Sequence, residues 1–148
     1  MKKLLMILCV LMVLSACGNQ ASKNNMKIGV LQWAEHPALV DSLDGMKQGL
    51  QELGVIDQID IEVKNANEDV SNATMIMSQF VNQKVDLVFA IATPAAQTAL
   101  THLKDTNIPL VFSAVSDPKI AGLVTNVDAP EANVTGVSDL PPLKQQLE

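Results

Sequence analysis

From residue 26 onward, the sequence alternates between short apolar runs and longer stretches in which apolar residues recur at helical spacing. The clearest run, residues 85–91, is apolar at nearly every position and is typical of a parallel strand buried on both faces. Further strands are predicted at residues 26–31, 59–63, 108–113 and 134–137. This regular exchange of strand and helix predicts an α/β fold, an open parallel sheet of about five strands with helices on both faces.

The helices expected between these strands have recognisable ends. Pro37 suits the first turn of a helix, where its missing N–H would be unpaired anyway, and Gly54 is expected to close that helix as its C-cap. Asp69 or Ser71 can cap the second helix, and Thr93 is expected as the N-cap of the third. The apolar faces predicted for the three helices are Leu39, Val40, Leu43, Met46, Leu50 and Leu53; Ala73, Ile76, Met77, Phe80 and Val81; and Ala95, Ala96, Ala99, Leu100 and Leu103.

The order of the strands follows from the pattern of the second one. Residues 59–63 alternate apolar and charged side chains, which indicates a half-exposed edge strand. Together with right-handed crossovers, this edge favours the order 2-1-3-4-5. In such sheets a ligand binds beyond the carboxyl ends of the strands, where the order reverses. The loops expected to face a ligand are therefore 32–37, 92–95 and 113–118.

The helix start that follows the third strand is a predicted anion site. Its free backbone N–H groups and positive dipole end favour a bound anion without help from a basic side chain. Thr93 can donate its hydroxyl to a ligand, or it can simply cap its own helix, and the sequence leaves both roles open. Trp33, the single tryptophan, ends the first strand. It can stack on a planar ligand group or pack in the core.

Two further loops carry charged or polar candidates. Glu35 can receive a ligand ammonium, although a solvated acid in the first turn of a helix is an equal alternative. His36 can hydrogen-bond a carboxylate or structure the turn before the following proline. Ser113 and Asp117 bracket the loop after the fourth strand, where Asp117 is expected to cap a short turn.

The N-terminus is typical of an export signal. Two lysines precede an apolar run over residues 4–14, which is too short to span about 30 Å of hydrocarbon but suits a signal peptide. The next residues, Leu14-Ser15-Ala16-Cys17, resemble the lipobox of bacterial lipoproteins. This resemblance implies cleavage after residue 16, acyl chains on Cys17, and a lipidated tether over residues 17–25 that holds an extracytoplasmic domain to the cell membrane.

Composition excludes several classes of function. Without the signal, eight lysines face sixteen acidic residues, for a formal charge of −8, and the chain has no arginine. This argues against nucleic-acid binding, which needs a basic face. Cys9 and Cys17 both lie in the signal region, and only His36 and His102 supply imidazoles, so neither a metal site nor a thiolate nucleophile is expected. No Gly-x-Ser-x-Gly elbow or glycine-rich phosphate loop occurs, so the sequence favours neither an enzyme nor a protein with a cofactor.

Several segments together resemble the solute-binding lipoproteins of an ABC importer family, whose members include proteins linked to tryptophan and other aromatic amino acids. The segments are residues 27–39 (KIGVLQWAEHPAL), 92–97 (ATPAAQ), 116–118 (SDP) and 134–139 (VTGVSD). The family has two similar lobes of a type I periplasmic-binding-protein-like fold, with the ligand closed between them. The resemblance therefore implies an N-terminal ligand-binding lobe at residues 26–139. Residues 140–148 would begin the crossover to a second lobe that is missing here.

The resemblance also implies a function: capture of an amino acid outside the cytoplasm and delivery to an ABC permease. The α-carboxylate would bind at the Thr93–Ala95 helix start, Glu35 or Asp117 would take the ammonium, and Trp33 would flank the side chain. The implied ligand-binding residues are Trp33, Glu35, His36, Thr93, Ala95, Ser113 and Asp117. Two alternatives stay open: an exported enzyme or a nucleoside-binding, sugar-binding or sensory lipoprotein of the same architecture, and a truncated fragment without function.

Overall fold

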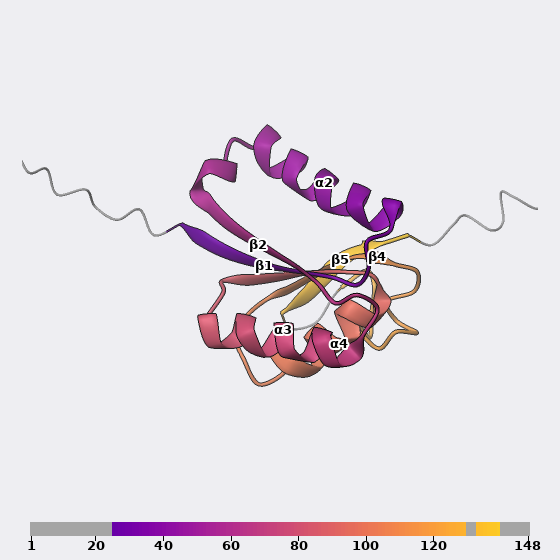
Figure 1. Ribbon diagram of the computed structural model, residues 1–148. Helices are drawn as coiled ribbons and strands as arrows, with labels where there is room; N and C mark the ends of the chain where they lie inside the picture. Colours follow the sequence, from indigo (N-terminus) through magenta and orange to yellow (C-terminus); the bar gives the residue numbers. More distant parts are fainter. Residues whose placement is uncertain (1–24, 130–132, 140–148) are drawn as a thin grey trace, which may run out of the picture.

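Five parallel strands form the sheet at the centre of the computed structural model, which describes residues 25–129 and 133–139 (Figure 1). The strands are β1 (Met26–Gln32), β2 (Ile59–Asn65), β3 (Leu87–Ile91), β4 (Leu110–Val115) and β5 (Val134–Ser138). Their order within the sheet is β2-β1-β3-β4-β5, and every neighbouring pair is parallel. Both the fold class and the strand order predicted from the sequence are confirmed.

Helices cover both faces of this sheet, as the alternating pattern predicts. Helix α2 (Pro37–Glu52) lies on one face, while α3 (Val70–Gln83) and α4 (Thr93–Leu103) lie together on the other (Figure 1). A short 3₁₀ turn, η2 (Ile56–Gln58), leads from α2 into β2. None of the helices in the described part of the chain is long and apolar enough to cross a membrane.

The ends of the strands differ from the predicted boundaries for reasons of hydrogen bonding. Strand β3 begins at Leu87 because the N–H of Val85 donates to the carbonyl of Phe80 and thereby closes α3. Lys84 adopts the left-handed conformation in that closing turn, with φ 53°. Strand β1 continues through Gln32, whose carbonyl accepts the N–H of Ala66 at 2.8 Å. This extension brings β1 fully to the carboxyl edge of the sheet.

The helix ends confirm two predictions and contradict two. Helix α2 starts at Pro37, and Asp69 caps α3 by accepting the N–H of Asn72 at 2.8 Å. The C-cap of α2 is Leu53 and not Gly54, which follows it in the left-handed conformation with φ 68°. Thr93 is not an N-cap, so that prediction is wrong. Ala92 occupies the cap position with φ 84° and ψ 154°, and Thr93 is already the first helical residue.

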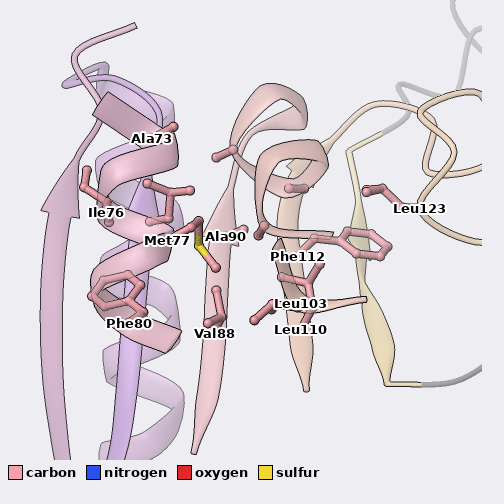
Figure 2. Packing of buried hydrophobic residues seen from close by; sticks show 14 of the residues in the cluster. Ala73, Ile76, Met77, Phe80, Val88, Ala90, Leu103, Leu110, Phe112 and Leu123 are labelled. Carbon is pink, nitrogen blue, oxygen red and sulfur yellow. The ribbon is translucent and has the colours of Figure 1, made fainter. Parts of the chain in front are cut away.

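Two hydrophobic clusters fill the space between the sheet and its helices. The larger one lies under α3 and α4, where Met77, Phe80 and Leu110 are fully buried (Figure 2). The smaller one lies under α2 and contains Ile28, Val30, Leu43, Phe89 and Ile91. Successive residues of β1 point to opposite faces of the sheet, as the pleat requires, so this strand contributes side chains to both clusters.

The predicted signal (1–16), the lipid-attachment residue Cys17 and the predicted crossover (140–148) lie outside the described residues. These assignments stay predictions. The predicted lobe, residues 26–139, spans the whole of the described sheet.

Candidate ligand-binding site

The carboxyl ends of the three inner strands lie side by side. Gln32 pairs in register with Ile91, and Ile91 pairs with Ser113. Two further backbone bonds connect the loops beyond them: the Trp33 N–H donates to the Ile91 carbonyl at 3.3 Å, and the Ala92 N–H donates to the Ser113 carbonyl at 3.0 Å. The three loops predicted to face a ligand are thus neighbours at the point where the strand order reverses.

The loop after β1 presents Trp33, Glu35 and His36 in three different ways. Trp33 is half-buried and packs against the larger hydrophobic cluster, so its ring is only partly available to a ligand. Glu35 is exposed. The ring of His36 caps α2, because its Nδ1 accepts the N–H of Ala38 at 3.3 Å. Of the two roles left open for His36, the structure shows the one that organises the turn.

The loop after β3 presents a helix start. The first N–H groups of a helix have no partner within it. Among the described residues, the N–H groups of Thr93 and Ala95 donate no hydrogen bond, whereas the N–H of Ala96 donates to the Ala92 carbonyl at 3.0 Å. Ala95 is fully buried, main chain included, so its N–H is covered in this lobe. The N–H of Thr93, at the positive end of the helix, is suited to a carboxylate.

The backbone of Ala92, at that helix start, is strained. A φ of 84° with ψ of 154° lies in a region that essentially only glycine adopts freely. Ala114, beside it on β4, also has a positive φ, 54°, at the irregularity in the pairing of β4 with β5. Such conformations cost of order 1–3 kcal/mol each and cluster at ligand sites. The two residues therefore mark the same edge as the predicted loops.

Ser113 lies within β4, which runs on to Val115, so only Asp117 of the two candidates lies in the loop after that strand. The hydroxyl of Ser113 lies 2.7 Å from the hydroxyl of Ser42 on α2, with which it shares a hydrogen bond. The carboxylate of Asp117 accepts the N–H groups of Lys119 and Ile120, each at 2.9 Å. The interpretation of Asp117 as the cap of a short turn is therefore confirmed.

Ser113 and Asp117 also line different hollows. Ser113 lines a groove of about 600 Å³ between α2 and the strands β4 and β5, together with the apolar side chains of Phe89, Val111 and Val137. Asp117 lines a cavity of about 450 Å³ that α2 does not border. The seven predicted residues thus share one edge of the sheet, but their side chains do not converge on a single hollow of this lobe.

Gln32 and the segment after β2 also contribute to this edge, although neither was predicted as part of the site. Gln32, at the end of β1, has a buried polar side chain, and the only signal for it is a polar residue closing an apolar run. The segment after β2 is the second: Asn67 and Glu68 both have positive φ, and the Glu68 N–H donates to the Trp33 carbonyl at 2.9 Å. Nothing in the local pattern of residues 66–68 predicts this contact, because it depends on the register of β2 against β1.

The electrostatics of the edge fit a small zwitterion better than a metal ion. Exposed Glu35 can face a cationic group, while the start of α4 can face an anionic one. Within residues 25–129 and 133–139, no group of three or more His, Cys, Asp or Glu side chains is placed to hold a metal ion.

Comparison with known proteins identifies relatives over most of the chain. Residues 27–148 match the model of the family described as ABC transporter substrate binding protein. The tyrosine-binding protein of Clostridioides difficile (strain R20291) is 40% identical over 129 residues, which are 86% of this chain and 37% of that protein.

Solved structures of similar proteins also match most of this chain. An ABC domain from Streptococcus pneumonia in complex with L-Trp is 43% identical, with a TM-score of 0.76 over 82% of this chain and 41% of that one. A ligand-free, open substrate binding protein with adhesive properties from Clostridium difficile is 42% identical, with a TM-score of 0.77 and the same coverage. The chain therefore spans about two fifths of the length of these relatives.

Proposed function

Because this chain belongs to the ABC transporter substrate binding protein family, we propose that it provides one ligand-binding lobe of a receptor for an aromatic amino acid. The receptor captures its ligand outside the cytoplasm and delivers it to an ABC permease. A lipid on Cys17 anchors it to the cell membrane, and residues 17–25 form the tether that allows the lobe to reach the permease. The protein acts by binding and not by catalysis.

One observation carries this proposal: three loops meet at the reversal point of the sheet, and one of them offers a strained, preformed helix start. The N–H of Thr93, which donates no hydrogen bond among the described residues, suits the α-carboxylate of an amino acid. The exposed carboxylate of Glu35, on the neighbouring loop, suits its ammonium. A ligand that carries both charges close together is recognised by this pair of groups.

The aromatic class of the ligand rests on the relatives. One is described as a tyrosine-binding protein and another was solved in complex with L-Trp. Trp33, half-buried at the same edge, offers an aromatic surface beside the charged groups. The second lobe, which the family resemblance implies, would cover the ligand from the other side, because a single open edge buries only part of a small molecule.

Titration calorimetry of the complete gene product, produced without residues 1–16, tests the proposal. The panel contains L-tryptophan, L-tyrosine, L-leucine, ribose and adenosine. We expect saturable binding of the two aromatic amino acids, with a much higher affinity than for the other three compounds. Binding of ribose or adenosine alone would contradict the amino-acid assignment, and turnover of any of these compounds would contradict a pure receptor.

The role of Glu35 has its own matched test. Glu35→Gln removes the charge that is proposed to face the ammonium and should weaken L-tryptophan binding by about tenfold or more, since a hydrogen bond to a charged group contributes roughly 1.5–3 kcal/mol. The control is Glu52→Gln at the far end of α2, where the carboxylate accepts only from Gln48. Equal affinity in the two variants would remove Glu35 from the site.

A further inference from the structure

Gln32 occupies an unusual position at the end of the central strand β1. It is 5% exposed, and of the polar and charged residues that the structure describes it alone is buried. Burial of a side-chain amide is unfavourable unless hydrogen bonds replace those lost to water. An apolar residue would fill this position at lower cost, so the amide calls for a specific explanation.

The hydrogen bond of the Gln32 side chain explains why an amide is buried at this position. The Nε2 atom donates to the Ala34 carbonyl at 2.9 Å. A carbonyl can only accept, so the amide must present its NH₂ group there. The Oε1 atom has no hydrogen-bond partner within the described residues. In this part of the chain every fully buried side-chain oxygen or nitrogen has a partner, so Oε1 must reach solvent.

Ala34 is buried, and this bond is the hydrogen bond that holds the middle of the first loop. The backbone of Trp33 is held on both sides, because its N–H donates to the Ile91 carbonyl and its carbonyl accepts the N–H of Glu68. His36 is fixed as the cap of α2. Between them, the backbone of Ala34 and Glu35 makes a single hydrogen bond with the described residues, and its donor is Gln32.

We propose that Gln32 is the positioning residue of the ligand site: its buried amide fixes the Trp33–His36 turn so that Glu35 faces the ligand and Trp33 keeps its half-buried orientation. The inference rests on the proposed function in one respect, the role of Glu35. Gln32 itself acts through Ala34, without contact to the ligand.

Three variants test the proposal on the complete gene product with L-tryptophan as the probe. Gln32→Leu removes the donor and should weaken binding by roughly three- to tenfold, the effect of one neutral hydrogen bond. The control Gln48→Leu removes an exposed amide that bonds only to Glu52 and should leave the affinity unchanged. Equal affinity of Gln32→Leu and the wild type would overturn the proposal.

Gln32→Glu separates positioning from a general loss of structure. An ionised carboxylate cannot donate to the Ala34 carbonyl, but a protonated one can, and burial favours the protonated form. Its affinity relative to the wild type should therefore be low at neutral pH and recover at mildly acidic pH, while Gln32→Leu shows no recovery. Glu35, His36 and Glu68 lie nearby in every variant, so the ratio to the wild type cancels their effect. Failure to recover would overturn the positioning role.

A measurement without ligand keeps this inference distinct from the proposed function. In the 148-residue chain Trp33 is the only tryptophan, so acrylamide quenching of its fluorescence reports the turn directly. Gln32→Leu should increase the quenching constant, and Gln32→Glu should return it to the wild-type value at mildly acidic pH. If the wild type binds no amino acid, the proposed function fails, and this quenching experiment still decides the role of Gln32: an unchanged constant would refute it.

Discussion

The two faces of the sheet are closed to different degrees. Under α3 and α4, large side chains such as Phe80, Met77 and Leu110 have less than 2% of their surface exposed (Figure 2). Under α2, the cluster ends in an open groove of about 600 Å³ beside β4 and β5, and Val137 on β5 is 68% exposed. The first face is closed beneath α3 and α4 and is hollowed beside β5 by the cavity of about 450 Å³ that Phe112 and Val124 line, whereas the second face is open along α2.

Small residues explain much of this difference. Helix α4 buries alanines at positions 95, 96 and 99, and these short side chains allow it to approach β3 and β4 closely. Helix α2 instead carries Gly45 and Gly49, and a Cβ atom added at either glycine would meet nothing within 4 Å. Gly45 lines the open groove. Stability is therefore concentrated on the α3/α4 face, while the α2 face keeps an open groove.

The largest effect on stability is expected for Phe80→Ala on the α3/α4 face, which is the closed face of the sheet. Removal of a fully buried ring leaves a cavity in tightly packed surroundings, so we expect a loss of about 3–5 kcal/mol in the free energy of unfolding. Urea denaturation followed by circular dichroism measures it. A loss below that of the α2-face variant described next would reverse the assignment of the two faces.

Leu43→Ala is the matched change on the α2 face. Leu43 is the one buried residue of α2, at 7% exposure, and it belongs to the cluster that also contains Phe89 and Met46, both of which line the open groove. We expect a loss of about 2–3 kcal/mol, at the low end for such a substitution, because the neighbouring side chains can relax toward the groove. The same urea titration applies, and the difference from Phe80→Ala is the quantity of interest.

Gly29→Ala tests how tightly the closed face is packed. A Cβ atom on Gly29 would lie 2.8 Å from two ring atoms of Phe80, closer than carbon atoms can approach. Overpacking of this kind should cost about 1–3 kcal/mol. The double variant Gly29→Ala/Phe80→Leu should be more stable than the sum of the single effects predicts, since the smaller side chain vacates the contact. Strict additivity in thermal melts would contradict the proposed contact.

Ser42→Ala addresses the polar pair on the α2 face. The hydroxyls of Ser42 and Ser113 lie 2.7 Å apart and are partly buried, so loss of one partner should cost about 1 kcal/mol. The control is Ser78→Ala, where an exposed hydroxyl bonds only to a carbonyl of its own helix. A smaller effect at position 42 than at position 78 would show that the pair contributes nothing to the attachment of α2.

Val137→Thr should have the smallest effect. The side chain is 68% exposed on the edge strand β5, so the expected change in stability is within about 0.5 kcal/mol. Chemical denaturation of the 148-residue chain measures it. A loss of more than 1 kcal/mol would mean that the α2 face is covered after all, and the comparison of the two faces would fail.

The sheet edge that carries the candidate site could be predicted from the sequence, but the conformations and contacts of its residues could not. The reversal point follows from the strand order, and it selected the loops that carry Trp33, Glu35 and Thr93. The N-cap of α4 could not be predicted, because Ala92 adopts a backbone conformation that its sequence disfavours and that only the surrounding sheet enforces. The hydroxyl of Ser113 could not be placed either, since its partner Ser42 is 71 residues away.

The sequence by itself determined the class of fold, the strand order and the family, because hydrophobic periodicity, the exposed pattern of β2 and short motifs are local properties of the chain. Only the tertiary structure decided which side chains point where. It placed Ser113 and Asp117 at different hollows and left a groove open beside α2. Among the described residues, it made Gln32 the one hydrogen-bond partner of the backbone of Ala34 and Glu35. These outcomes depend on contacts between residues in different strands, which the packing of the whole sheet sets and no local pattern encodes.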